Sequence, residues 1–500
     1  MSDSSITLNG QDLEFDDFSR IVDDRVEVQI SQSAEERINQ AREYVMDNID
    51  TDKAVYGLNR GVGENKDQVV LAEYFENYNK NLIYAHCVAV KPEAKEWEVR
   101  AALAARLNTL LVGRTGIQPD IVKMYRDFLN HEIHPVLPKR GSIGQGDIAC
   151  LSHIGLAMIG EGEVFYQGKR MNAEKALDMA GLTPIKLGPK DGLAIVSSNA
   201  LSAGIGAMMI KEVDQLIKTA DLVYSFSLEG IKGNVTPLDL RPYKYRPYDG
   251  QKECVERVRD YLDGSYLWQP GITDTLQDAL SYRSACHVHG AAVDSLNYAK
   301  EQLKTQLNSS DDNPCVLFED DDMISCGNYE PLTWVLALEM LSIGLSHVSK
   351  TSCSRTRHLS DPDVTGLSRF LTPKMGETIA YGTIQKPFTA LNSEVRELSN
   401  PSSVDYMAVA GNIEDHASNA PQVVDKLSKI IDNIYYILGL EALHAAQAVD
   451  LRGVEDSLGE DTKKLYKSLR EDIPFLDQDR PLTDDIEKSY QVVKNNEIID

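Results

Sequence analysis

The sequence predicts a mainly α-helical protein with a long central helical bundle and a smaller mixed region toward the N-terminus. Between about 198 and 470, apolar residues recur every three or four positions, which is the period of an amphipathic helix. Four long runs show this pattern: 203–231, 276–306, 331–352 and 421–450. Strand-like stretches are few and short. Helices of this length bury their apolar faces by packing side by side, so we expect a bundle.

The N-terminal part mixes short strand-like and helical patterns. Polar and apolar residues alternate over 1–30 around an Asn-Gly turn signal, which predicts a short strand pair. A helix is expected after Ser33, a plausible N-cap, and a Gly-rich loop at 56–63 interrupts the helical pattern. Helical periodicity resumes over 67–130, and the β-prone run 163–167 is the other expected strand.

Composition and charge restrict the class of protein. We expect three segments: an N-terminal domain at 1–200, a central helical bundle at 201–470 and an acidic C-terminal cap at 471–500. The net charge of -26 argues against nucleic acid or an anionic membrane as partner. Seven scattered cysteines without a C-x-x-C pair fit reduced thiols better than a disulfide framework or a zinc site. No signal peptide is visible, and the most apolar helical stretch, 334–348, carries Glu339 and is too short to span a bilayer. We therefore expect a cytoplasmic enzyme.

The loop at 141–147 carries the most informative signal. It reads Gly-Ser-Ile-Gly-Gln-Gly-Asp, and its flanks are 133–138 and 151–157. Loop and flanks resemble the aromatic amino-acid ammonia-lyase family, in which Ala-Ser-Gly in this loop forms the electrophile methylidene-imidazolone. Here Gln145 stands where Ala-Ser is expected, and the loop is one residue short. Ser142 is followed by isoleucine instead of the unhindered glycine that ring closure favours, so we expect no cofactor.

Four further segments resemble motifs of the same family, in the family's order. They lie at 55–63, at 276–283, at 312–314 with 327–329, and at 412–416. One such motif would be weak evidence, but five in order identify a member. The resemblance implies an ammonia-lyase/fumarase-like fold and a homotetramer whose active sites take residues from three subunits.

Two residues of these motifs have expected roles in catalysis and carboxylate binding. The resemblance makes Tyr56 the base that takes the β-proton of the substrate, although it could instead cap a hydrophobic patch. A phenol needs nearby positive charge or hydrogen bonds to act at neutral pH, and Arg60 or Arg283 could supply the charge. The resemblance assigns Arg283 to the substrate carboxylate, which a guanidinium binds through two parallel hydrogen bonds. The alternative for Arg283 is a salt bridge to Asp278 or to another carboxylate on a helix.

Other residues match positions that line the family's substrate pocket. Glu414 would pair with an imidazole-type N–H, with an ion pair or a solvated turn as the alternative. His86 would line the same pocket, although a buried core histidine is nearly as plausible. Asp415 and His416 are expected as supports for Glu414. No metal site is evident, because side chains two positions apart on a helix, such as those of His287 and its neighbour His289, diverge.

The residues that differ from the family pattern stand at positions that serve its prosthetic group. Ser197 stands where the family has an asparagine that holds the electrophile, and Leu280 replaces a tyrosine close to the electrophile and the amine. Together with Gln145, these changes remove the residues that form and support the prosthetic group. The expected base, Tyr56, and the expected carboxylate-binding residue, Arg283, are retained. A primary ammonium leaves poorly without an electrophile, whereas a trimethylammonium leaves without one. The pattern therefore predicts a small-molecule betaine as substrate.

Three further residues have expected roles toward such a betaine. Tyr329 or Tyr282 could face the trimethylammonium through a cation–π contact. Lys386, aligned four residues after the pocket-lining Gly382, would share its helical face and could polarise a thione sulfur. Pro387 instead favours a helix entrance at Lys386, and a surface lysine is equally plausible.

The expected reaction is elimination of trimethylamine from ergothioneine, the betaine of 2-thiohistidine, to give thiourocanate. Three alternatives remain: the same elimination on hercynine or another betaine, a histidine-type ammonia-lyase or aminomutase with an unusual electrophile, and an inactive paralogue with a binding or structural role.

Overall fold

The computed structural model describes residues 5–49, 53–273 and 275–499, and it confirms the mainly helical fold class. The chain forms two compact units, each assembled from separate segments. Unit 1 comprises Met1–Ile210, Lys300–Leu336 and Pro401–Asp425; unit 2 comprises Lys211–Ala299, Ala337–Asn400 and Lys426–Asp500. This division differs from three consecutive segments, because four long helices each have residues in both units.

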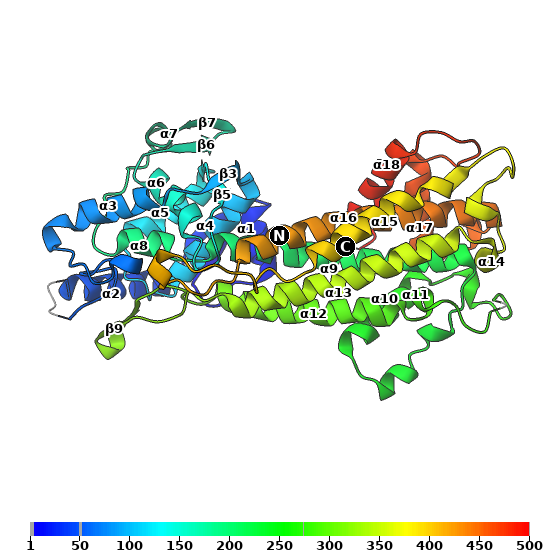
Figure 1. The fold of residues 1–500 in the computed structure, drawn as a ribbon, viewed down its shortest axis with the longest axis horizontal. Helices are drawn as coiled ribbons and strands as arrows, with labels where there is room; N and C mark the ends of the chain where they lie inside the picture. Colours follow the sequence, from blue (N-terminus) through cyan, green and yellow to red (C-terminus); the bar gives the residue numbers. More distant parts are fainter. Residues whose placement is uncertain (1–4, 50–52, 274, 500) are drawn as a thin grey trace. The chain divides into compact units, whose positions relative to one another are not determined.

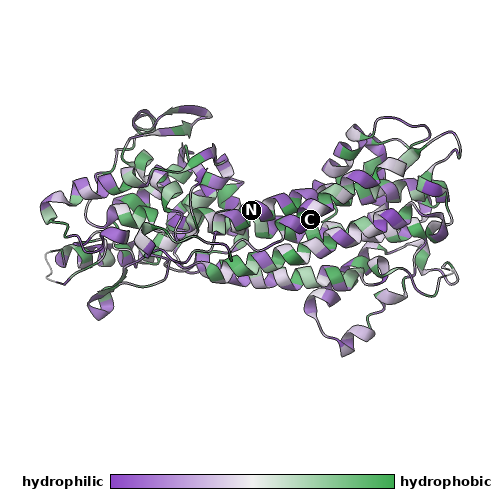
Figure 2. Cartoon of the chain, viewed as in Figure 1, coloured by the Kyte–Doolittle hydropathy of each residue, from purple (hydrophilic) through white to green (hydrophobic). Residues whose placement is uncertain are grey.

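These four helices correspond to the runs expected from the sequence. They are α9 (Ala200–Ile231), α12 (Ala285–Leu307), α13 (Leu332–Leu359) and α16 (Ala420–Arg452). Within unit 2 they lie side by side (Figure 1), and hydrophobic and hydrophilic residues alternate along each of them (Figure 2). Many of their apolar side chains, such as those of Leu216, Leu345 and Leu438, are fully buried. The other α-helices of unit 2 are α10 (Asp249–Tyr261), α11 (Leu280–Arg283), α14 (Pro362–Thr365), α15 (Gln385–Leu398), α17 (Glu460–Asp472) and α18 (Thr483–Lys494).

Buried ion pairs link the helices of unit 2. The Arg355 guanidinium donates two hydrogen bonds to Glu441, at 2.5 and 2.9 Å, and both side chains are fully buried. The Asp221 carboxylate contacts Arg257 at 2.8 Å and the Nδ1 atom of His289 at 2.6 Å. Removing one member of such a pair typically costs about 3–5 kcal/mol, because an uncompensated charge is left in the core.

Unit 1 contains the strands together with shorter helices. Its helices are α1 (Phe15–Val22), α2 (Gln32–Asp47), α3 (Phe75–His86), α4 (Glu96–Leu111), α5 (Pro119–Asn130), α6 (Ile148–Met158), α7 (Ala173–Ala180) and α8 (Asp191–Val196). Its strands are β1 (Ser5–Leu8), β2 (Glu27–Ile30), β3 (Val90–Glu93), β4 (His134–Pro135), β5 (Pro138–Arg140), β6 (Glu163–Tyr166), β7 (Lys169–Asn172), β8 (Cys315–Leu317) and β9 (Asp322–Ile324).

The expected strands are present, with one difference in connection. Strands β1 and β2 pair in parallel, so the expected strand pair is not a hairpin but is joined through α1. Strand β6 forms at 163–166 as expected and pairs with β4 and β7 in a three-stranded sheet. Figure 1 shows β6, β7 and α7 together in this unit. Helix α2 begins two residues earlier than expected, because Ser31 and not Ser33 caps it by accepting a hydrogen bond from the Ala34 N–H.

Two helical stretches have the length and composition that could cross a membrane. They are Asp191–Ile231 and Leu332–Leu359, whose most apolar windows are 94% and 56% buried within the protein. The second contains the stretch at 334–348, so the helix is longer than the sequence pattern suggested. Burial of the first window within the protein is sufficient to explain its apolar character.

Candidate active site

The loop at 141–147 in unit 1 is anchored by a buried carboxylate at its C-terminal end. Asp147 accepts hydrogen bonds from Ser142 Oγ at 2.8 Å and from the backbone N and Oγ of Ser202 at 2.8 and 2.9 Å. Burial raises the pKa of Asp147, and these hydrogen bonds lower it in part. The hydroxyl of Ser142 is therefore engaged in holding the loop together.

Asn199 connects this loop to the segment that carries Tyr329. Its side-chain oxygen accepts from the Gly146 N–H at 3.0 Å, and its amide nitrogen donates to the Tyr329 carbonyl at 2.6 Å. The backbone of Asn199 is itself held by Asp311, which also bonds the buried Arg106 at 2.8 Å. The loop and Tyr329 are thus fixed to the same rigid part of unit 1.

Gln145, the residue at the altered loop position, reaches a carboxylate. Its Nε2 atom donates to Glu330 Oε2 at 2.6 Å, while its Oε1 atom is buried without a hydrogen-bond partner in the described structure. The other oxygen of Glu330 accepts from the Leu332 N–H at 3.0 Å, at the start of α13. His416 Nε2 lies 3.4 Å from Glu330 Oε2.

These residues do not fit methylidene-imidazolone. The position that should supply Ala-Ser is a glutamine bonded to Glu330, and the nearby serine, Ser142, is bonded to Asp147 and followed by isoleucine. Ser197, which replaces the supporting asparagine of the family, is buried at the end of α8. No step of the chemistry below passes through that group.

Tyr56 lies half-buried on the Gly-rich loop, where its hydroxyl accepts a hydrogen bond from the Gly63 N–H at 2.9 Å. Burial raises the pKa of Tyr56, and the Gly63 N–H lowers it. Tyr329, Glu414 and Tyr78 raise it further, which brings them within electrostatic reach of the Tyr56 hydroxyl. Two of the expected site residues, Tyr329 and Glu414, therefore lie near the expected base.

Arg60 does not supply the positive charge that was expected near Tyr56. The Arg60 guanidinium donates to the carbonyl oxygen of Asn59 at 3.0 Å, and Arg60 is not among the groups that shift the pKa of Tyr56. The groups that raise this pKa through their charge, Tyr329, Glu414 and Tyr78, are all anionic when ionised.

Glu414 lies on a short irregular segment instead of a helix. Its backbone oxygen accepts from the Val409 N–H at 3.0 Å and from the Tyr406 hydroxyl, which fixes the segment. Its side chain is half-buried, and the described residues form no ion pair with it. Of its expected supports, Asp415 is exposed, whereas His416 contacts Glu330.

His86 is the last residue of α3 and remains partly exposed, so it is not a fully buried core histidine. Its Nδ1 atom lies 2.7 Å from the Leu82 carbonyl oxygen and must donate to it. The neutral ring then presents Nε2 as an acceptor, which suits an imidazole-type N–H.

Arg283 in unit 2 lines a pocket of about 520 Å³. The expected alternative, a salt bridge to Asp278, is not formed, because that carboxylate accepts from the Asn234 N–H at 2.6 Å and from Thr275 Oγ1 at 2.9 Å. The described residues offer no carboxylate partner to Arg283. The remaining lining residues are Asn234, Thr236, Pro237, Pro242, Tyr243, Arg246, Leu276, Gln277, Asp278, Ser284 and His287.

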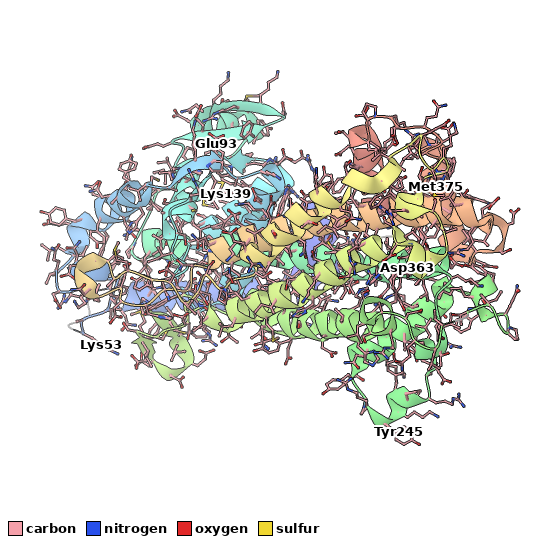
Figure 3. The ribbon with its side chains drawn as sticks, turned by 45° about the vertical axis from the view of Figure 1, so that its right-hand side comes forward. Lys53, Glu93, Lys139, Tyr245, Asp363 and Met375 are labelled. Carbon is pink, nitrogen blue, oxygen red and sulfur yellow. The ribbon has the colours of Figure 1, made fainter. Side chains whose placement is uncertain are left out.

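The approach to this pocket is open and partly apolar. Leu280, which replaces the family tyrosine, is 64% exposed next to Arg283. The segment before α10 extends from the helices of unit 2, with Tyr245 92% exposed on it (Figure 3). The ring of His287 lies 5.4 Å from that of Tyr243 (centroid to centroid) at a tilt of 32°, whereas His289 is buried and contacts Asp221, so the two histidines diverge as expected.

Two expected residues of unit 2 require correction. Tyr282 is 1% exposed, and its hydroxyl contacts Ser227 Oγ at 2.9 Å, so this core position argues against a direct contact with a ligand. Lys386 is exposed at the second position of α15, as Pro387 suggested. Gly382 belongs to the separate 3-10 helix Ala380–Thr383, so it does not share a helical face with Lys386.

Three residues near Tyr56 and the loop were missed at the sequence level. Asn199 lies two positions after Ser197, and that proximity was a usable signal. Glu330 precedes a proline and a long apolar run, which is typical of an acidic residue at a helix start. Nothing in the sequence pattern singled out Tyr78. Among the described residues, no group of three or more His, Cys, Asp or Glu side chains could hold a metal ion.

Comparisons with known proteins find similar proteins that match nearly the whole chain. The aromatic amino acid lyase family matches residues 13–471. Histidine ammonia-lyase of Alkaliphilus oremlandii is 33% identical over 497 residues, 99% of this chain and 98% of the relative. Ergothionase of Treponema denticola, solved in complex with desmethyl-ergothioneine sulfonic acid, is 46% identical with a TM-score of 0.96 and 99% of each chain covered. Tyrosine aminomutase of Streptomyces globisporus is 27% identical with a TM-score of 0.93, covering 99% of this chain and 97% of that one. The chain therefore belongs to the aromatic amino acid lyase family.

Proposed function

We propose that this protein is a carbon–nitrogen lyase that eliminates trimethylamine from ergothioneine to give thiourocanate, without a methylidene-imidazolone. Family membership and the ergothionase neighbour support a carbon–nitrogen lyase. The observation that carries the finer proposal is Gln145, which is bonded to Glu330 at the loop position of the missing electrophile. Without that electrophile, the substrate must carry a group that leaves unaided.

The proposed reaction is a proton abstraction coupled to loss of the amine. The Tyr56 phenolate takes the β-proton, the electrons of the C–H bond form the Cα–Cβ double bond, and the C–N bond breaks. Its electron pair stays on nitrogen, which departs as neutral trimethylamine. A quaternary nitrogen has no lone pair for an electrophile to capture, so loss of the electrophile does not impair this reaction.

The substrate would supply the cation that Tyr56 lacks in unit 1. A trimethylammonium beside the phenol favours the phenolate, because opposite charges stabilise the ionised form. Tyr329, whose hydroxyl acts on Tyr56, would face the same cation through its ring. The base would thus become effective only when a cationic substrate is bound.

The remaining residues would bind the other groups of the substrate. Arg283 would bind the carboxylate, since its guanidinium has no carboxylate partner in the described structure. Glu414 and His86 would bind the imidazole-like ring, and Lys386 would polarise the thione sulfur and so acidify the β-carbon. Ser197 would lie behind the ligand. In this proposal the enzyme is a cytoplasmic homotetramer whose active sites combine residues of several subunits.

Parallel incubation with ergothioneine, hercynine and histidine tests the proposal, with trimethylamine and ammonia assayed in each reaction. We expect trimethylamine from ergothioneine and no ammonia from histidine. A preference for hercynine would make hercynine the substrate in place of ergothioneine. Ammonia released from histidine would indicate that the protein carries an electrophile. The intact mass of the protein shows whether such an electrophile is present, because its formation by cyclisation removes water and makes the chain lighter. Binding of a betaine without turnover would identify an inactive paralogue.

A further inference from the structure

Glu330 is a charged side chain held in place beside the altered loop. Gln145 Nε2 donates to its Oε2 atom at 2.6 Å, and the Leu332 N–H donates to Oε1 at 3.0 Å. Its side chain remains 34% exposed, so Glu330 is not enclosed by the protein. A role as the cap of α13 explains the bond from Leu332. It explains neither the bond from Gln145 nor the partial exposure of the Glu330 side chain.

We propose that Glu330 is the anionic contact for the quaternary ammonium group of the substrate, and that Gln145 is the positioning residue that orients its carboxylate. This inference rests on the proposed function, which supplies a substrate with such a cation.

The position of Glu330 supports this role. Gln145 occupies the loop position from which relatives act on the amine, and its side chain points to Glu330. The Asn199 amide bonds the carbonyl of Tyr329, the residue before Glu330, to the same loop. Tyr329 in turn lies within electrostatic reach of the hydroxyl of Tyr56. The carboxylate and the altered loop position are therefore in direct contact within unit 1, and the residue before Glu330 lies within electrostatic reach of the expected base.

The bonding state of Glu330 suits a quaternary cation better than a primary one. A carboxylate has about four lone-pair positions, and Leu332 and Gln145 occupy two of them, with His416 3.4 Å from Oε2. A primary ammonium requires free acceptors for its N–H groups, whereas a trimethylammonium has no N–H and requires only negative charge. The Glu330 carboxylate therefore has few acceptor positions left for the N–H groups of a primary ammonium.

The chemistry predicts where the contribution of Glu330 appears in the kinetics. The nitrogen loses its positive charge as the C–N bond breaks, so the carboxylate stabilises the bound substrate more than the transition state. An interaction of this kind lowers KM without raising kcat. Neutralising Glu330 should therefore raise KM and leave kcat unchanged or slightly higher.

The test compares the full-length wild type with Glu330→Gln, which keeps an acceptor for the Leu332 N–H. Glu163→Gln is the matched control, because Glu163 is an exposed carboxylate on β6 paired with Arg170. The probes are ergothioneine as substrate, tetramethylammonium as an inhibitor and binder, and thiourocanate as a product without the cation. Gln145→Ala, which keeps the charge but removes its orienting bond, should show a smaller effect of the same kind.

We expect Glu330→Gln to raise KM for ergothioneine and the inhibition constant of tetramethylammonium by about 10- to 100-fold. Its kcat should stay within about threefold, and the affinity for thiourocanate should not change. An unchanged KM, or equal weakening of thiourocanate, would overturn the proposal, the latter by showing a merely structural role. If the wild type releases no trimethylamine, the proposed function fails. Calorimetry of tetramethylammonium binding to both proteins then decides the role of Glu330 separately.

Discussion

Replacing Gly144 by alanine should destabilise unit 1 far more than the same change at a matched glycine. Gly144 has a φ of +84°, and a Cβ added there would lie 2.3 Å from Ser418 Oγ and 2.6 Å from the backbone nitrogen of Ala420. The hydroxyl can rotate away, but the backbone nitrogen cannot. Relief of the clash must separate the loop from 418–420, which breaks the bonds Ser418 Oγ–Gly144 O (3.0 Å) and Asn419 N–Ile143 O (2.8 Å).

The expected magnitude follows from these contacts. The left-handed backbone conformation costs alanine about 1 kcal/mol, and each lost hydrogen bond costs about 1 kcal/mol more. We expect about 3 kcal/mol for Gly144→Ala. Gly168→Ala is the control, because Gly168 has a φ of +70° with nothing within 4 Å of its added Cβ. It should show only the backbone cost of about 1 kcal/mol.

The assay is the half-life of helical circular dichroism at a fixed elevated temperature, since large proteins often unfold irreversibly. A difference of about 2 kcal/mol corresponds to roughly a 30-fold shorter half-life for Gly144→Ala than for Gly168→Ala, if the contacts break before the transition state for unfolding. Half-lives within about threefold of each other would refute the argument that this close approach holds the loop against 418–420.

Four other substitutions test the site and the fold. Tyr56→Phe should lower kcat on ergothioneine by about 10²- to 10⁴-fold while substrate binding by calorimetry persists; retained turnover would remove Tyr56 as the base. Glu414→Gln should shift the rising limb of kcat/KM toward lower pH, because Glu414 raises the pKa of Tyr56; an unshifted limb contradicts this coupling. Arg283→Lys should raise KM by about tenfold or more through loss of bidentate binding, and an unchanged KM would exclude the carboxylate contact. Burial raises the pKa of Glu229 to about 7, so the folded state binds its proton more tightly than the unfolded state. The free energy of unfolding should therefore fall by about 3 kcal/mol between about pH 4.5 and 7. Denaturant unfolding of Glu229→Gln should lack this contribution, and equal pH dependence in both proteins would refute it.

The helices were the most predictable part of the fold, because their apolar period persists over 20 residues or more. The runs at 203–231 and 421–450 correspond closely to α9 and α16. The strands were less predictable, since β3, β5, β8 and β9 are only three or four residues long, and β3 pairs with β5 far along the chain. A two-residue strand such as β4 has no sequence pattern of its own. Its existence depends on β6 lying beside it.

The motifs selected candidate site residues whose placement the structure describes, whereas the roles of these residues stay predictions. The structure places Tyr56, Tyr329 and Glu414 near one another, and it places Arg283 in a pocket without a carboxylate partner. Tyr282 was misjudged because its motif neighbour Arg283 faces the pocket, whereas the next residue on a helix points elsewhere. Contacts between motifs were not predictable, because the sequence does not say which segments meet.

The contacts that fix the loop explain how its chemistry could change while the fold remained. Asp147 holds one end through Ser142 and Ser202, and Asn199 holds the Gly146 N–H. None of these bonds involves the side chain at position 145. A substitution there costs the scaffold little, whereas it decides whether an electrophile can form. In the proposed function, Gln145 instead orients Glu330, the proposed contact of the quaternary ammonium. In the proposed function, a change of leaving group therefore requires changes at position 145 and its surroundings, whereas the contacts of Asp147 and Asn199 keep the shortened loop anchored.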